Sequence, residues 1–292
     1  MTPRKPGRWL PKRIVAGLAV ALGLMGVRAR ADFDWNLPKG FPRPAVPVDN
    51  PMTAAKVELG RYLFYDTRPS VNGKESCGSC HRQELAFTDG RALARGATGQ
   101  LHPRSSMSLV NVAYAQRLTW ADPALTSLES QALLPMLGTD PIELGLKGHE
   151  QEFLAALRRD AVYTTRFPAA FPGEGDAFTL SNVTKAIAAF ERSIVSMRSP
   201  YDRYRWGGDS SAISDAMHDG SLATLEEVID HYAAGGKFDH PNKSRIVRPF
   251  ALTACERRDL VEFLKSLTDE ELLHDPRWSD PWPAVKRLTA SK

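Results

Sequence analysis

The stretch Cys77-Gly78-Ser79-Cys80-His81 decides the fold of this chain, because it indicates a cofactor that the surrounding helices must enclose. Two thiols spaced three residues apart can each add to one vinyl group of a haem, and the histidine that follows can serve as an axial ligand of the iron. The motif predicts one covalently bound haem c, attached through Cys77 and Cys80, with His81 as the proximal ligand.

Three other interpretations of these cysteines are weaker. A thioredoxin-type redox pair would need a βαβ context, and a zinc site would need two further Cys or His ligands nearby. A structural disulfide would leave His81 unexplained. The chain has 3 cysteines, and Cys255 stands alone, so no disulfide framework is expected.

The start of the chain is typical of an export signal. Residues 1–31 contain seven basic and no acidic residues, an apolar stretch over 14–27, and Ala29-Arg30-Ala31 as a cleavage site before Asp32. The apolar stretch is shorter than the roughly 20 residues of a membrane-spanning helix. We therefore expect cleavage of a 1–31 signal peptide, and a product that resides in the periplasm and does not span the membrane.

The charge of the expected product argues against nucleic acid as a partner. The whole chain has a net charge of +4, but without residues 1–31 it keeps 31 basic against 34 acidic residues, a net of −3. Nucleic-acid binding usually requires a basic surface. The small acidic excess suits a basic redox partner only weakly.

The pattern beyond the motif predicts a mostly α protein. Residues 32–52 contain five prolines and read as an extended arm, and residues 67–126 read as loops and short turns around the cofactor. No alternating runs rich in valine or isoleucine occur. Helical periodicity is found at residues 53–66, 126–137, 149–160, 181–197, 224–236 and 253–268.

Capping residues support several of these helices. Ser181 is the expected N-cap of the helix over 181–197, and Thr-x-x-Glu capping boxes begin at Thr224 and Thr253. Cys255 is expected to be a small core residue. The last helix is expected to bury Leu260, Phe263, Leu264 and Leu267.

Further motifs follow one another in a fixed order, and together they resemble one family. They are Leu59-Gly60-Arg61-x-Leu63-Phe64-Tyr65-Asp66, Ser76–His81, Ala86–Gly90, Ser108-Leu109-x-Asn111-x-Ala113, Thr119-Trp120, Ser127–Ala132, Pro141-x-Glu143-Leu144-Gly145, Ser199–Tyr204 and Met217–Ser221. The chain resembles the bacterial di-haem cytochrome c peroxidases and their MauG-like relatives, the branch of methanobactin-associated di-haem enzymes most of all. The resemblance covers about residues 49–284.

The resemblance implies a c-type cytochrome-like haem domain at 53–200, followed by a second cytochrome-like domain. It makes His81 the proximal ligand of the peroxide-reacting haem, Glu143 the distal acid–base carboxylate, and Gln131 the distal glutamine beside it. Peroxide must lose a proton at one oxygen and gain one at the other before the O–O bond breaks. A buried carboxyl with a raised pKa suits that task.

Two more roles follow from the resemblance. Trp120 matches the tryptophan between the two haems of the family, and Asn111 matches one ligand of a calcium ion. Without the resemblance, Glu143 would be read as a surface acid and Trp120 as a packing residue. His102, which precedes Pro103, is either a distal-side residue or, as loop histidines more often are, a surface residue.

The chain departs from the family in one major respect, since it contains a single Cys-x-x-Cys-His. Residues 205–216 lead directly from Ser199–Tyr204 into Met217–Ser221, where relatives carry a long segment with the second haem motif and the other calcium ligands. Residues 201–292 are therefore expected to be a remnant of the second domain without its haem. Met217 is expected to ligate nothing, and a calcium site built on Asn111 is incomplete.

We expect a periplasmic oxidoreductase that reduces hydrogen peroxide, or uses it to oxidise a protein or a small donor, with a redox protein or another electron donor as partner. The alternative is a mono-haem electron-transfer cytochrome without peroxidase turnover. The two differ at the sixth iron position, which is open in the first and occupied in the second.

Overall fold

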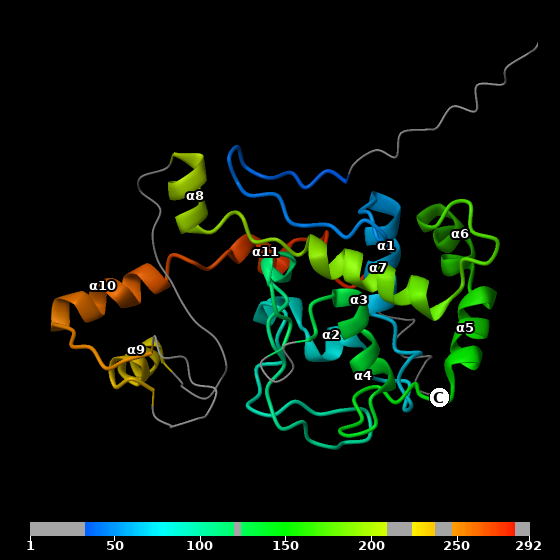
Figure 1. Cartoon of the computed structure of the whole chain (residues 1–292), viewed down its shortest axis with the longest axis horizontal. Helices are drawn as coiled ribbons and strands as arrows, with labels where there is room; N and C mark the ends of the chain where they lie inside the picture. The colour runs from blue at the N-terminus through cyan, green and yellow to red at the C-terminus, as the bar shows by residue number, and fades with distance from the viewer. Residues whose placement is uncertain (1–32, 120–123, 209–223, 237–246, 284–292) are drawn as a thin grey trace, which may run out of the picture. The chain divides into compact units, whose positions relative to one another are not determined.

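The computed structural model describes residues 33–119, 124–208, 224–236 and 247–283, and Figure 1 shows the order of their helices. As predicted, this part of the chain is mostly α. It contains no strand, and its isolated bridges join Arg82 to Thr88 and Arg95 to Leu101. None of its helices is both long enough and apolar enough to cross a bilayer.

Two crossing helices form the centre of the fold (Figure 1): α1 (Ala54–Phe64) and α7 (Leu180–Ser193). They approach closely at Gly60, where a Cβ atom would lie 1.9 Å from the carbonyl oxygen of Ala186. The predicted apolar stripe of α7 is confirmed. The core side chains at this crossing are Leu59, Leu63, Phe64, Val183, Ile187, Phe190 and Ile194, each no more than 2% exposed.

The N-terminus of α7 differs from the prediction. The N-cap is Thr179, whose side chain accepts a hydrogen bond from the backbone N–H of Asn182, and the helix begins at Leu180. Ser181 lies inside the first turn and is exposed. Thr179 has the extended backbone that an N-cap requires (φ −120°, ψ 154°), so its hydroxyl can reach the free amide.

Shorter helices surround this centre. The predicted helix over 126–137 is divided at Ala132 into α3 (Leu128–Gln131) and α4 (Leu133–Leu137), and α3 packs against α7. The helix α5 (Glu150–Arg159) matches its prediction. It packs against α6 (Ala161–Ala170), which in turn contacts α1. Residues 33–52 form no helix, and their side chains Trp35 and Met52 pack with Ala189 and Val195 in a second apolar cluster.

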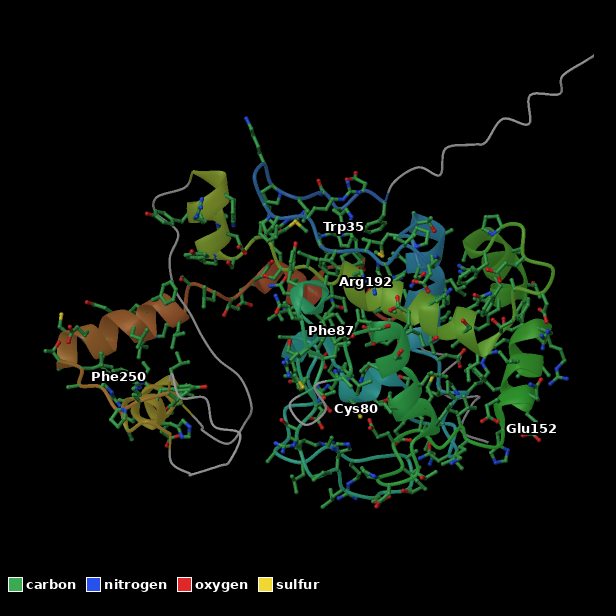
Figure 2. All side chains as sticks on the ribbon, in the orientation of Figure 1. Trp35, Cys80, Phe87, Glu152, Arg192 and Phe250 are labelled. Atoms are coloured by element: carbon green, nitrogen blue, oxygen red, sulfur yellow. The ribbon has the colours of Figure 1, made fainter. Side chains whose placement is uncertain are left out.

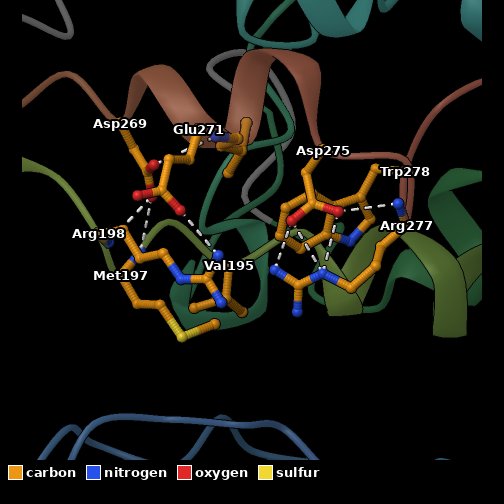
Figure 3. A pocket seen from close by; sticks show the side chains of 9 residues that line it. Val195, Met197, Arg198, Asp269, Glu271, Asp275, Arg277 and Trp278 are labelled. Carbon is orange, nitrogen blue, oxygen red and sulfur yellow. Dashed lines mark hydrogen bonds and ion pairs between the residues drawn. The ribbon is translucent and has the colours of Figure 1, made fainter.

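The C-terminal segment is attached to the same core. Asp269, just before α11 (Glu270–His274), accepts hydrogen bonds at Oδ2 from the backbone N–H groups of Met197 (3.1 Å) and Arg198 (3.0 Å) (Figure 3). The Ser196 hydroxyl donates to the same oxygen at 3.1 Å. Trp278 donates its indole N–H to the Ser193 hydroxyl at 3.3 Å. These bonds tie the end of the described chain to the segment that follows α7.

The helices α8 (Pro200–Gly207), α9 (Leu225–Ala233) and α10 (Ala254–Leu264) have capped N-termini. The capping boxes predicted at Thr224 and Thr253 are confirmed, and Ser199 with Asp202 forms a third. The buried face predicted for α10 is wrong. Phe263 and Leu267 are 42% and 40% exposed, Cys255 is exposed, and the buried side of the helix is centred on Val261 instead.

Candidate haem site

The two cysteines of the motif lie in α2 (Cys77–Cys80), a single helical turn. The backbone N–H of Ser76 donates to the Ser79 hydroxyl at 2.9 Å and fixes the start of this turn. Both thiols are half-buried and no disulfide joins them. Burial raises the pKa of both thiols, that of Cys80 to about 11, so both sulfurs carry their protons at neutral pH.

Gly78 lets this turn lie flat against an aromatic side chain. A Cβ atom at Gly78 would be 2.4 Å from the ring of Tyr65. Tyr65 in turn packs against Phe64 (ring centroids 5.1 Å apart) and Phe190 (6.3 Å). The turn that holds the thiols therefore rests on aromatic residues of α1 and α7.

The imidazole of His81 is held by a backbone carbonyl. Its Nδ1 lies 2.8 Å from the carbonyl oxygen of Phe87, which can only accept, so Nδ1 carries the hydrogen. Burial lowers the pKa of His81, an effect opposed by the carbonyls of Phe87 and Met107, and the ring is neutral. The lone pair is then on Nε2, as metal-binding histidines require.

Phe87 brings its carbonyl to this position through an unusual backbone. Ala86 and Phe87 both have positive φ angles, of 52° and 59°. The turn is closed by a hydrogen bond from the Phe87 N–H to the Arg82 carbonyl at 2.8 Å, and the Phe87 side chain is fully buried. Figure 2 shows Phe87 and Cys80 in the same part of the molecule, with Glu152 at a distance on α5.

Glu143 lies beside the same thiols. Residues 94–104 form a hairpin that holds the Glu143 backbone, because the N–H of Ala97 donates to the Glu143 carbonyl at 2.7 Å. Burial raises the pKa of the Glu143 carboxyl, and the charge of His102, whose Nε2 lies 3.5 Å away, lowers it. The charge of Glu143 in turn raises the pKa of both Cys77 and Cys80, which places the carboxylate within electrostatic reach of both sulfurs.

The remaining residues predicted for the site are less closely associated. Gln131 ends α3 and forms no side-chain hydrogen bond with Glu143. Asn111 accepts a hydrogen bond at Oδ1 from the Ser196 N–H (2.9 Å), and its own N–H donates to the Ile194 carbonyl (2.9 Å). The described residues contain no cluster of three or more His, Cys, Asp or Glu side chains suited to a metal ion. Trp120 and Met217 lie outside the described residues.

One buried acid was not anticipated from the sequence. Glu191 on α7 is 4% exposed, and its Oε2 has no hydrogen-bond partner. Burial raises its pKa to about 8, and its charge acts on Cys77. A signal was present, because Glu191 falls between Ile187 and Ile194 on the apolar stripe of the helix. Its neighbour Arg192, also buried, instead pairs with Glu129 at 2.9 Å.

These residues fit a covalently attached haem. The motif supplies two free thiols on one turn, a neutral imidazole with its Nε2 lone pair available, and aromatic packing that fixes the turn. Two carboxyl groups lie near these thiols. One oxygen of Glu191 has no hydrogen-bond partner, and burial raises the pKa of Glu143.

Comparison with known proteins agrees with this geometry. A family model described as di-haem cytochrome c peroxidase matches residues 54–211. The methylamine utilization protein MauG of Methylorubrum extorquens is 29% identical, over 80% of this chain and 83% of that protein. The crystal structure of a MauG-like protein associated with microbial copper homeostasis superposes with a TM-score of 0.78, at 35% identity over 86% of this chain and 100% of the other.

A third relative shows a difference in length. A cytochrome-c peroxidase of Denitromonas iodatirespirans is 29% identical over 369 aligned positions, covering 90% of this chain and 95% of the relative. This chain has 292 residues, so at least 77 of those positions face a gap in it. The gap agrees with a chain that holds 3 cysteines and a single Cys-x-x-Cys-His.

Proposed function

Because this chain belongs to the di-haem cytochrome c peroxidase family, which makes it an oxidoreductase, we propose that it uses hydrogen peroxide as its oxidant at one haem c. Cys77 and Cys80 would attach the haem and His81 would bind the iron from the proximal side. When bound, the haem supplies the redox-active iron on which peroxide reacts. The electrons come from a redox protein or from a small or protein donor.

The observation that carries this proposal is the position of Glu143. Its carboxyl is half-buried, has a raised pKa and lies within electrostatic reach of both thiols. Such a carboxyl can take a proton from one peroxide oxygen and return it to the other. General acid–base catalysis of this kind contributes roughly 10²–10⁴-fold. Gln131, at the end of α3, is proposed to orient the peroxide.

The number of haems is proposed from the cysteines. With one Cys-x-x-Cys-His, the chain can attach one haem by two thioethers, and the second haem of the family has no attachment site. Trp120 is then proposed to connect the haem with an external donor. A calcium ion at Asn111 stays doubtful, because one oxygen lone pair of that side chain already accepts the Ser196 N–H.

The proposed location is the periplasm, on the basis of the export signal expected in residues 1–31. Covalent attachment suits an exported protein, since the cofactor cannot diffuse away. The donor would meet the protein in the same compartment.

The single haem motif also favours a second candidate, a mono-haem electron-transfer cytochrome. In that case a sixth ligand would occupy the iron and peroxide would not react. Peroxidase activity and an open sixth position distinguish the two functions.

The test adds stoichiometric hydrogen peroxide to the purified haem protein and follows its absorption spectrum. A prompt spectral change that Glu143→Gln slows at least 10²-fold supports the peroxidase. Glu152→Gln is the matched control, because Glu152 is 79% exposed on α5. A six-coordinate spectrum that peroxide leaves unchanged would support the electron carrier.

A further inference from the structure

The hairpin over residues 94–104 places His102 beside Glu143. Its two arms are joined by the isolated bridge between Arg95 and Leu101 and by the N–H of His102, which donates to the Ala94 carbonyl at 2.8 Å. His102 is therefore fixed at the base of the hairpin by backbone bonding. The His102 side chain is 31% exposed and that of Glu143 is 39% exposed, so both groups meet water as well as each other.

The same hairpin is bonded to residues 140–143, the segment that carries the Glu143 carboxyl. The side chain of Gln100 accepts from the Ile142 N–H at 3.0 Å and donates to Asp140 at 3.3 Å. A Cβ atom at Gly96 would lie 1.9 Å from the carbonyl oxygen of Ile142, so only glycine permits this contact. The hairpin and residues 140–143 thus form one unit, which fixes the position of His102 relative to Glu143.

Within this unit, His102 Nε2 lies 3.5 Å from Glu143 Oε1. This separation suits an ion pair. A small side-chain rotation or one bridging water turns it into a path for proton transfer, and such contacts often tighten when a substrate is bound. Among the described residues, His102 is the charged group that lowers the pKa of Glu143. The thiols of Cys77 and Cys80 also interact with Glu143, but haem attachment would convert them to uncharged thioethers.

We propose that His102 is the positioning residue of Glu143 and the group that exchanges protons with its carboxyl. This inference rests on the proposed function. Reduction of one peroxide to two waters consumes two electrons, which the reduced donor supplies, and two protons. The imidazolium N–H bond breaks as the carboxyl O–H bond forms, and water then returns a proton to the imidazole. Histidine suits this role because each of its two ring nitrogens can carry a proton or release it.

The chain contains a matched control. His149 and Glu152 form a second histidine–glutamate pair, with Nδ1 2.8 Å from Oε2, in which the two side chains are 62% and 79% exposed. This pair lies at the start of α5, outside the haem site. The exchange of His149 for Gln therefore removes the same chemical pair without touching Glu143.

The experiment measures the titration of Glu143 in the haem protein directly, by difference infrared spectroscopy of the protonated carboxyl. Glu143→Gln identifies the band. In His102→Gln the midpoint of the Glu143 titration is expected to rise, because the positive charge that lowers the pKa of Glu143 is gone. The acidic limb of the pH profile of peroxide turnover should move by the same amount. His149→Gln should change neither. In His102→Gly, added imidazole should restore the titration midpoint of Glu143 and the acidic limb of peroxide turnover.

The outcomes are distinct. An unchanged infrared midpoint in His102→Gln, or an equal shift in His149→Gln, overturns the inference. If peroxide turnover is absent in every variant while the midpoint still moves, the pairing stands and the proposed function fails. If turnover is present but neither His102 variant alters the midpoint or the acidic limb, the function stands and the inference fails. Because His102 is partly exposed, both variants should fold, and haem content verifies this.

Discussion

His81 Nδ1 lies 2.8 Å from the carbonyl oxygen of Phe87, and this contact determines which nitrogen of the ring carries the hydrogen. Since a carbonyl cannot donate, the hydrogen is on Nδ1 and the lone pair on Nε2. Phe87 holds its carbonyl there from a left-handed backbone with φ 59°, while its side chain is buried in the core. The packing of the fold thus orients the His81 ring before any cofactor is considered.

The first prediction concerns the crossing of α1 and α7. Gly60→Ala should lower the free energy of unfolding by about 1–3 kcal/mol or more, because the new Cβ atom would be 1.9 Å from the Ala186 carbonyl oxygen and the helices must separate. Gly175→Ala, where no atom lies within 4 Å of the added Cβ, is the control. Denaturant unfolding of both variants measures the difference, and equal stability would show that the helices do not cross this closely.

The second prediction concerns Asp269. Asp269→Ala leaves the Ser196 hydroxyl and the N–H groups of Met197 and Arg198 without their buried acceptor. A loss of about 2–4 kcal/mol is expected, since unsatisfied buried donors cost about 1–3 kcal/mol each and some will find water. Asp230→Ala removes an exposed ion pair with Arg257 and should cost less than about 1 kcal/mol. Similar midpoints for the two variants in denaturant would contradict the docking of the C-terminal segment.

The third prediction uses Glu191. Burial raises the pKa of Glu191 from 4.5 to about 8, so between these values the folded protein holds a proton that the unfolded chain has released. The free energy of unfolding should therefore fall as pH rises through this window, by up to about 1.4 kcal/mol per pH unit from this group. Glu191→Gln should flatten the dependence, most visibly from pH 5 to 8. A stability profile identical to that of the parent protein would exclude a buried, protonated Glu191.

The fourth prediction concerns Gly78. Gly78→Val places a branched side chain where even a Cβ atom would be 2.4 Å from the Tyr65 ring, so the turn that carries the thiols must move away from α1. Haem incorporation in the exporting host should drop severalfold. Ser79→Thr is the comparison, because Ser79 is exposed on the same turn, lies between the same two cysteines, and as threonine keeps the hydroxyl that accepts from the Ser76 N–H. Equal haem yields would mean that the Tyr65 contact does not position the motif.

The sequence alone predicted those parts of the fold that local signals determine. The capping boxes at Thr224 and Thr253 begin the expected helices. The apolar repeat of α7 identified its buried residues. The helix α6 was not predicted from the sequence, and it contains Pro168, a residue that disfavours a helix interior because it removes one backbone hydrogen bond. The exposure of Phe263 depends on tertiary packing that no local pattern records.

The site was predictable to a similar degree. The motif at 77–81 predicts covalent haem attachment by itself, whereas a catalytic role for Glu143 followed only from the resemblance to a family. The position of His102 next to Glu143 required the hairpin, because 40 residues of sequence separate the two side chains. Glu191 was not singled out from the sequence, although it falls on the apolar stripe of α7, and the packing of that helix shows that its side chain is buried.

The most direct test of the account is the intact mass of the exported, purified protein. We predict a chain that begins at Asp32 and carries the added mass of one haem, which peptide mapping locates on Cys77 and Cys80. A mass without haem, with those two sulfurs free or joined to each other, would contradict the central claim.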